Sequence, residues 1–275
     1  MTIDSAVMQL PQGCYRYGNE AGAKVLLLHS SQSNSGQWRE LIQRLAANYD
    51  ILAIDLLGYG KAPPASLKSR DAFRFSDEVP RIVDCVSAVW GDAPVLLVGH
   101  SYGGALALKL ALEQLLVVTA VAVFEPVAFH ILDANDPARA EIEKVATETD
   151  QADALLSTEL FVDYWNQPGY FRALPEKIQH AMAAQADKVS MDFAALMGEP
   201  HKLVDYRLLN RPVLLLTGSE SRLSARSVAA QLQQVLPEVT LEHVACGHMG
   251  PLTHPQLVNP LLVAFIEQQR ACSSD

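Results

Sequence analysis

A serine lies between two glycines near the middle of the chain, in the pattern Gly99-His100-Ser101-Tyr102-Gly103. The apolar run 95–98 precedes it, and an Ala- and Leu-rich stretch that favours a helix follows. Between a buried strand and a helix, G-x-S-x-G predicts a sharp turn that exposes the serine hydroxyl above a sheet edge. An ordinary strand-to-helix turn that happens to contain serine is the alternative, and this context disfavours it. We therefore expect Ser101 to act as a nucleophile.

A histidine is needed as the base, because a serine hydroxyl is a weak nucleophile until its proton is accepted. Of the eight histidines, His248 alone lies on a glycine-rich loop after a late buried strand, which places it at the same sheet edge as Ser101. His100 is adjacent in sequence, but side-chain alternation along a strand points it away from the turn. His254 precedes Pro255, where the start of a helix explains it. His248 is therefore the predicted base.

Short apolar runs alternate with helical patterns through most of the chain. A short edge strand is predicted at 13–18, and buried strands are predicted at 24–29, 49–55, 95–98, 119–124, 212–218 and 239–244. This alternation predicts an α/β fold with a mostly parallel, doubly wound sheet. The binding crevice of such a sheet lies at the carboxyl ends of its strands.

The pattern changes between residues 129 and 210, where helices are indicated but no convincing strand. Asp136-Pro137 forms an N-cap and first-turn pair, and Asp150 is the predicted cap of a second helix. A third helix is predicted over residues 174–197. An all-helical insertion between two strands of a parallel sheet is expected to cover the carboxyl edge as a lid. The alternative is a helical subdomain without a role at the site.

We therefore predict a core formed by residues 1–128 and 211–275, with residues 129–210 inserted as a helical cap. The cap supplies aromatic and aliphatic side chains but few cations. The predicted substrate-binding residues within it are Phe161, Tyr164 and Trp165.

Composition excludes several classes of function. The formal net charge of −10 opposes binding to nucleic acid. No apolar run approaches the ~20 residues of a membrane span, and the first residues carry neither the basic stretch nor the apolar core of a signal peptide. The four cysteines are scattered without metal-type spacing, which predicts reduced thiols in a cytoplasmic protein; they are Cys14, Cys85, Cys246 and Cys272. No metal and no cofactor is predicted, and nothing in the sequence specifies an oligomeric state.

The chain resembles the α/β-hydrolase family over essentially its whole length. The resemblance is carried by four motifs in the right order: the loop from His29 to Trp38, Asp55–Gly60, the serine turn Gly99–Gly104, and Gly247–Gly250. It implies Ser101 as nucleophile and His248 as base, in the chain order serine, acid, histidine.

The acid is where this chain departs from the family. An aspartate often follows three residues after the glycine that here is Gly218, but that position holds Ser221. Glu220 on the same loop and Glu125 at the end of the preceding strand can substitute for it. We favour Glu125, because its carboxylate emerges from a rigid strand end followed by a proline, whereas a glutamate on a polar loop is ordinarily solvated. More remote candidates are Asp192 and Asp205.

An oxyanion hole needs two backbone donors. The N–H of Tyr102, directly after the nucleophile, is the first. The second is expected from the loop after the first buried strand, where the family usually has His-Gly and this chain has His29-Ser30-Ser31. By position Ser31 is the predicted donor, with Ser30 as the alternative.

These residues predict a serine hydrolase that cleaves a small, largely apolar carboxylic ester through an acyl-enzyme, so that its partner is a small-molecule substrate. The same scaffold also supports thioesterases, carbon–carbon bond hydrolases, perhydrolases and lyases. A ligand-binding receptor without catalytic activity is the alternative from a different class. A serine in place of an aspartate nucleophile argues against a dehalogenase or an epoxide hydrolase.

Overall fold

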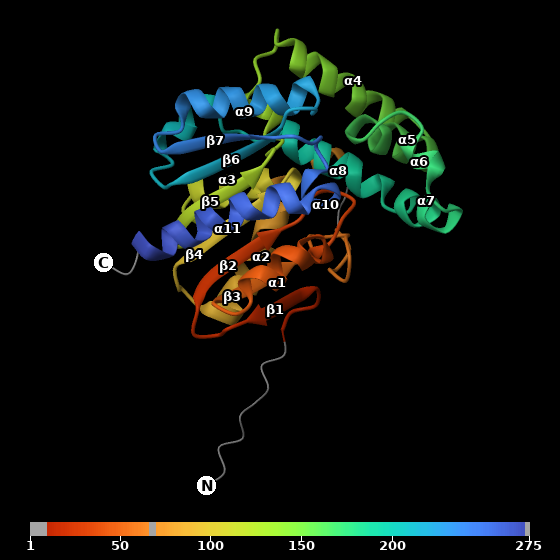
Figure 1. The fold of residues 1–275 in the computed structure, drawn as a ribbon. Coiled ribbons are helices and arrows are strands. Elements are labelled where there is room, and N and C mark those ends of the chain that lie inside the picture. The colour runs from red at the N-terminus through yellow and green to blue at the C-terminus, as the bar shows by residue number, and fades with distance from the viewer. Residues whose placement is uncertain (1–9, 66–69, 273–275) are drawn as a thin grey trace.

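The predicted strands form a seven-stranded sheet in the order β1-β3-β2-β4-β5-β6-β7 (Figure 1). The computed structural model describes residues 10–65 and 70–272. Only β1 runs antiparallel to its neighbour, so the sheet is mostly parallel, as predicted. The strands are β1 (Cys14–Gly18), β2 (Ala23–Leu28), β3 (Tyr49–Ile54), β4 (Val95–His100), β5 (Val118–Phe124), β6 (Val213–Gly218) and β7 (Val239–Val244).

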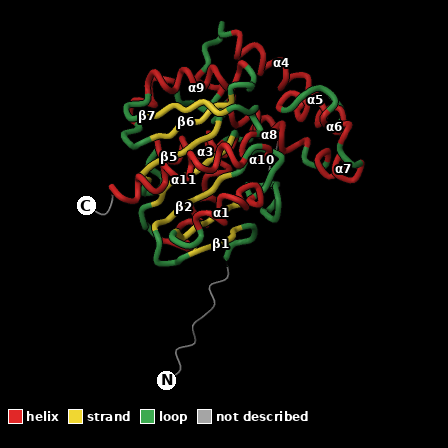
Figure 2. The backbone as a smooth tube through the Cα atoms, viewed as in Figure 1, coloured by secondary structure: helices red, strands yellow, loops and turns green. Residues whose placement is uncertain are grey.

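Helices cover both faces of this sheet, since the side chains of each central strand alternate between two apolar layers. Val25 and Leu27 of β2 join the layer of α1 (Arg39–Leu45) and α11 (Pro255–Cys272). Leu26 and Leu28 join the opposite layer, with α2 (Phe75–Trp90), α3 (Tyr102–Leu112) and α9 (Leu223–Val235). Figure 2 shows the strands in yellow among the helices in red. The doubly wound α/β fold is confirmed.

The chain between β5 and β6 is helical throughout its regular elements, as predicted. In Figure 1 the helices of this segment, coloured green to cyan, gather on one side of the molecule. They are α4 (Pro137–Gln151), α5 (Ala154–Trp165), α6 (Tyr170–Ala173), α7 (Glu176–Ala183) and α8 (Ala186–Met197). Short turns of 3-10 helix and one short helix complete the fold: η1 (Ser35–Trp38), η2 (Arg70–Ala72), η3 (Phe129–Ile131), η4 (Leu203–Leu208) and α10 (Gly250–Thr253).

Helix boundaries in this segment agree only partly with the sequence patterns. Asp136 caps α4 as predicted, because its carboxylate accepts the N–H of Ala138 at 2.8 Å. The prediction that Asp150 caps the next helix is wrong, since Asp150 lies inside α4. Asp153 caps α5 instead, and its carboxylate accepts two backbone N–H groups at 3.0 Å. The single helix predicted over 174–197 is divided into α7 and α8.

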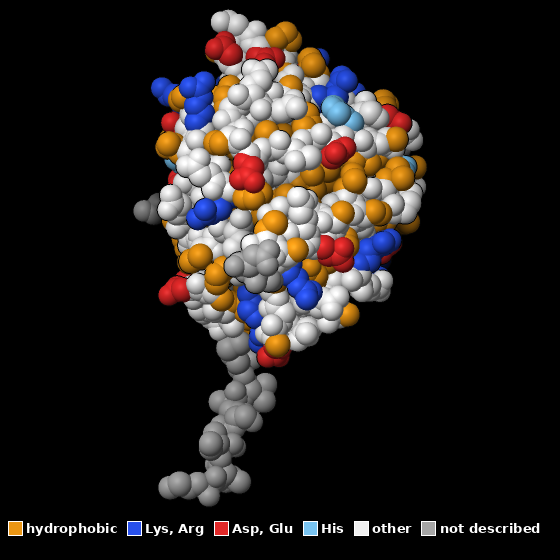
Figure 3. All heavy atoms as spheres, turned by 60° about the vertical axis from the view of Figure 1, so that its left-hand side comes forward, with side chains coloured by type: hydrophobic (Ala, Val, Ile, Leu, Met, Phe, Trp, Pro, Cys, Tyr) orange, Lys and Arg blue, Asp and Glu red, His pale blue; other side chains and the backbone are white. Residues whose placement is uncertain are grey.

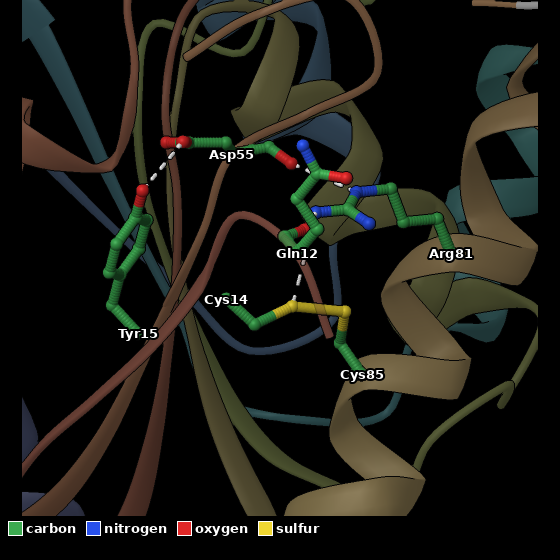
Figure 4. The surroundings of a disulfide bond; sticks show 6 residues. All are labelled: Gln12, Cys14, Tyr15, Asp55, Arg81 and Cys85. Carbon is green, nitrogen blue, oxygen red and sulfur yellow. Dashed lines mark hydrogen bonds between the residues drawn. A yellow bond between two sulfur atoms is a disulfide. The ribbon is translucent and has the colours of Figure 1, made fainter. Parts of the chain in front are cut away.

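The prediction of four reduced thiols is wrong for Cys14 and Cys85, which form a disulfide between β1 and α2 (Figure 4). The two residues are 71 positions apart in sequence. They meet because β1 closes the edge of the sheet and α2 packs against that edge, where Arg81 also donates to the carbonyl oxygen of Asp55 at 3.0 Å. Cys246 and Cys272 are free. Since disulfides are uncommon in reducing compartments, the cysteines no longer support the predicted cytoplasmic location, which stays a prediction.

The surface carries both signs of charge. On the face shown in Figure 3, basic and acidic side chains lie singly or in small groups between apolar ones. Within the described part of the chain, no helix is both long enough and apolar enough to span a bilayer.

Candidate active site

Ser101 lies at the tip of the turn between β4 and α3, in a conformation that few non-glycine residues adopt, with φ 55° and ψ −120°. The flanking glycines permit this turn. A Cβ on Gly99 would lie 2.4 Å from the carbonyl oxygen of Gly103, and a Cβ on Gly103 would lie 2.4 Å from that of His29. Any larger residue at either position would push the helix away from the sheet. The two glycines therefore allow the close approach of helix and sheet that the turn requires.

A hydrogen-bonded chain joins three side chains from distant parts of the sequence. The Ser101 hydroxyl lies 2.9 Å from Nε2 of His248. On the other side of the ring, Nδ1 of His248 lies 2.6 Å from Oε2 of Glu125. A carboxylate at Nδ1 keeps the proton on that nitrogen and leaves Nε2 free to accept from the serine. The three residues follow β4, β5 and β7, whose carboxyl ends meet at one edge of the sheet.

Glu125 is fully buried at the end of β5 and is fixed from two sides. Its second oxygen, Oε1, accepts the backbone N–H of Gly218 at 2.7 Å and the hydroxyl of Thr217 at 3.0 Å. Burial alone would raise the pKa of Glu125, but the hydrogen bond and charge of His248 hold it below its usual value. Glu220, the other predicted candidate, is exposed on the loop after β6. The structure thus brings Glu125 to His248, and leaves Glu220 facing solvent.

Two further residues hold the His248 loop, and sequence reasoning identified neither role. Trp165 of α5 stacks on the imidazole, with ring centroids 3.8 Å apart. Nε2 of His100 donates to the backbone carbonyl oxygen of His248 at 2.9 Å. Burial lowers the pKa of His100 well below its usual value, so the ring is neutral. This contact joins residues 148 positions apart in sequence, so no local pattern predicts it.

The loop after β2 contains the other predicted backbone donors. The N–H of Ser30 already donates to the side-chain oxygen of Gln37 at 3.2 Å. The hydroxyl of Ser31 donates to Oδ2 of Asp192, on α8, at 2.6 Å. Tyr102 is the first residue of α3, so its N–H lies at the helix N-terminus, where the helix dipole favours negative charge. Asp192, considered from sequence as a remote candidate for the acid, therefore contacts this loop.

A cavity of about 230 Å³ opens beside Ser101 and His248. Its walls are mainly apolar and come from α5, α6, α7, α10 and the turn between α6 and α7. They include Phe161, Trp165, Leu174, Met182 and Leu252. A much smaller cavity of about 10 Å³ shares four lining residues with the larger one, namely Ser31, Ser101, Phe161 and Trp165. Tyr164 lies outside both linings, and its hydroxyl shares a hydrogen bond of 2.6 Å with Ser224 on α9. Of the three predicted substrate-binding residues, two therefore line the cavity.

One group of side chains has the elements of a cation site, but an ammonium already occupies it. Ligand atoms of Glu113, Glu199 and His201 lie within 4.8 Å of one another. The Nζ atom of Lys109 donates to Glu113 at 2.6 Å and to Glu199 at 3.0 Å. None of these four residues lines the cavity at Ser101. The group is an ion-pair network between α3 and the end of the helical segment.

Comparison with known proteins identifies the family. The sequence matches the model of the alpha/beta hydrolase family over residues 25–261, so the chain belongs to this family. It is similar to the lipase LipV of Mycobacterium tuberculosis, with 27% identity, covering 87% of this chain and 92% of that protein.

Solved structures share the fold at low sequence identity. A hydrolase from Oleispira antarctica superposes with a TM-score of 0.75 at 15% identity, covering 93% of this chain and 94% of that one. The carboxylesterase CesB of Bacillus subtilis gives a TM-score of 0.69 at 20% identity, covering 94% and 90%. The family match over residues 25–261 confirms the resemblance drawn from the motifs.

Proposed function

We propose that this protein hydrolyses esters of small, largely apolar carboxylic acids through an acyl-enzyme on Ser101. The observation that carries the proposal is the hydrogen-bonded chain from Ser101 through His248 to the buried Glu125. The names of relatives agree with it, since LipV is a lipase and CesB a carboxylesterase.

The chemistry follows from the positions of the protons. Nε2 of His248 accepts the Ser101 proton as Oγ attacks the ester carbonyl, which gives a tetrahedral intermediate. The imidazolium returns this proton to the alcohol oxygen as the carbon–oxygen bond breaks. Water then attacks the acyl-enzyme, with His248 again as the base, and the acid leaves. Glu125 stabilises the imidazolium in both steps and holds its tautomer.

The oxyanion hole consists, in this proposal, of the N–H groups of Tyr102 and Ser31. The α3 N-terminus favours negative charge at Tyr102. On the other loop, Ser31 is favoured over Ser30, because the Ser30 amide is already bonded to Gln37. Two such donors aimed at the developing oxyanion are worth several kcal/mol of barrier lowering, typically about 3 kcal/mol for one of them.

The helical segment acts as a cap, residues 129–210, inserted in a core formed by residues 1–128 and 211–275. Support comes from Phe161 and Trp165, which bring α5 against the cavity at Ser101. The larger cavity includes His248, which protonates the leaving group, so it fits the alcohol portion. The cavity of about 10 Å³ touches Ser101 and Ser31 but not His248, so it marks the side on which the acyl portion lies, and its walls must move apart to admit one. A space so small favours a short acyl chain over a long one.

The test is a panel of 4-nitrophenyl esters, from acetate to octanoate, together with labelling of Ser101 by a fluorophosphonate. We expect rapid labelling that Ser101→Ala abolishes, and kcat/KM that falls by about tenfold or more between acetate and octanoate, since one methylene is worth about 1 kcal/mol in a fitted pocket. An unreactive Ser101 would instead indicate a ligand-binding protein. Preference for an acetyl thioester over the matched ester would assign a thioesterase.

A further inference from the structure

A buried ion pair joins α8 to the core next to the proposed oxyanion hole. Lys188 and Asp192 lie one turn apart on α8, and their charged groups are in contact. Nζ of Lys188 also lies 3.3 Å from Oε2 of Glu78 on α2. Burial alone would lower the pKa of Lys188, but the charges of Asp192 and Glu78 raise it above its usual value, so the lysine is charged. The side chains of Lys188 and Asp192 are only 6% and 2% exposed.

Each member of this pair contacts one of the two proposed oxyanion residues. Oδ2 of Asp192 accepts the hydroxyl of Ser31 at 2.6 Å. Nζ of Lys188 lies 4.9 Å from the ring centroid of Tyr102, over its face. The ion pair on α8 thus contacts the side chains of both proposed donor residues, although Ser31 and Asp192 are 161 positions apart in sequence.

Resting on the proposed function, we infer that Asp192 positions the oxyanion hole by holding Ser31 through its hydroxyl. A glycine at position 31 would have no hydroxyl for Asp192 to hold. Ser31 carries this hydroxyl on the same residue whose N–H is the proposed donor. Lys188 serves a related purpose. An unpaired Asp192 carboxylate this close to a developing oxyanion would destabilise the negative charge on it. The ammonium of Lys188 offsets the charge of the carboxylate. The hole is then fully ordered only when α8 is docked on the core.

The bonding of Asp192 favours this role over direct contact with substrate. Oδ2 accepts from Tyr59 at 2.6 Å as well as from Ser31, and Oδ1 contacts Lys188. Both oxygens are thus engaged, although Asp192 is part of the lining of the small cavity. We therefore describe Asp192 as a positioning residue that acts through Ser31.

The test compares kcat and KM of Asp192→Asn, Ser31→Ala and the double variant on a short-chain 4-nitrophenyl ester, with thermal unfolding of each. We expect Asp192→Asn to lower kcat by about 10- to 100-fold, less than the loss of a whole donor, with KM changed by less than about threefold. Ser31→Ala should lower kcat in the same direction. The double variant should be no more than about twofold worse than Asp192→Asn, because both changes break one link.

Glu199→Gln is the matched control. Glu199 is also a buried carboxylate that joins the end of the helical segment to a lysine of the core, at 3.0 Å from Lys109, but it contacts neither oxyanion loop. We expect it to lower the unfolding temperature while kcat stays within about twofold of wild type.

Three outcomes would overturn the inference. The first is a double variant whose loss of kcat equals the product of the losses in the two single variants. The second is a change in KM with kcat unchanged in Asp192→Asn. The third is a loss of kcat in Glu199→Gln equal to that in Asp192→Asn when both variants are equally destabilised. If Asp192→Asn does not fold, Ser31→Ala tests the inference instead, because an unchanged kcat in Ser31→Ala is by itself enough to contradict it. A wild-type protein that neither hydrolyses esters nor labels at Ser101 refutes the proposed function instead, so the two failures are distinguishable.

Discussion

The two walls of the cavity are built in different ways. On the sheet side, Ser101 and His248 line the cavity and Glu125 is buried behind His248. Hydrogen bonds of 2.6–2.9 Å join the three residues, which follow three strand ends. On the helical side, the contact is mainly apolar and comes from residues such as Phe161 and Met182. Proton transfer needs fixed distances, which hydrogen-bonded strands provide, whereas an apolar wall needs only shape. Substitutions on the sheet side should therefore change rate, and those on the helical side should change preference.

The largest effect is expected for Ser101→Ala on the sheet side. Removing the attacking oxygen should lower kcat on the order of 10⁴-fold or more, while far-ultraviolet circular dichroism and unfolding temperature stay close to wild type. Residual turnover above a few per cent would contradict the serine mechanism.

Glu125→Gln should have the next largest effect. Glutamine keeps the size of the side chain and its hydrogen bonding but removes the charge that stabilises the imidazolium of His248. We expect kcat to fall by about 10² to 10⁴-fold with little change in KM. Glu220→Gln is the matched control on the exposed loop, and it should cost less than about tenfold. An equal loss of kcat in both variants would contradict the assignment of Glu125 as the acid.

Phe161→Ala tests the helical wall. Phe161 lines both cavities, so its truncation should join them and admit a longer acyl chain. We expect the kcat/KM ratio of butanoate to acetate, which differ by two methylenes, to rise by about tenfold, the usual scale for one or two methylenes in an apolar pocket. Leu156→Ala, at an exposed position on the same helix, should leave the ratio unchanged. A fall in stability without a change of preference would show that this wall does not select the substrate.

The smallest effect concerns pH and the loop after β2. His29 is fully buried, Nε2 accepts the N–H of Leu56 at 2.9 Å, and burial lowers the pKa of His29 to about 4. Between pH 6.5 and 4 the unfolded chain therefore binds a proton that the folded protein does not, and stability falls as pH falls, by on the order of 3 kcal/mol from this group. Stability should be independent of this group above pH 6.5.

Urea unfolding at pH 7.0, 5.5 and 4.5 measures this dependence. His29→Asn should reduce the slope of unfolding free energy against pH, whereas His180→Gln, at an exposed position on α7, should not. An unchanged slope in His29→Asn would assign the pH dependence to other groups, such as the partly buried His130, whose pKa burial also lowers to about 4.

The sequence predicts the order of the strands along the chain, the helical segment between β5 and β6, and the turn that presents Ser101. Apolar runs and glycine positions are local properties, so these elements could be predicted from short windows. The choice of Glu125 over Glu220 was favoured from the sequence, because a strand end is rigid and a polar loop is solvated.

Contacts between side chains that are distant in sequence are visible only in the folded structure. The disulfide between Cys14 and Cys85, the hydrogen bond from Ser31 to Asp192 and the stacking of Trp165 on His248 all join segments far apart in sequence. The direction of Tyr164 toward Ser224, away from the cavity, is of the same kind. Such contacts depend on strand order and on how each helix is rotated against the sheet, and neither has a signature in the residues that make them. Local patterns predict whether a residue lies on a strand or a helix, but its neighbours depend on how these elements pack.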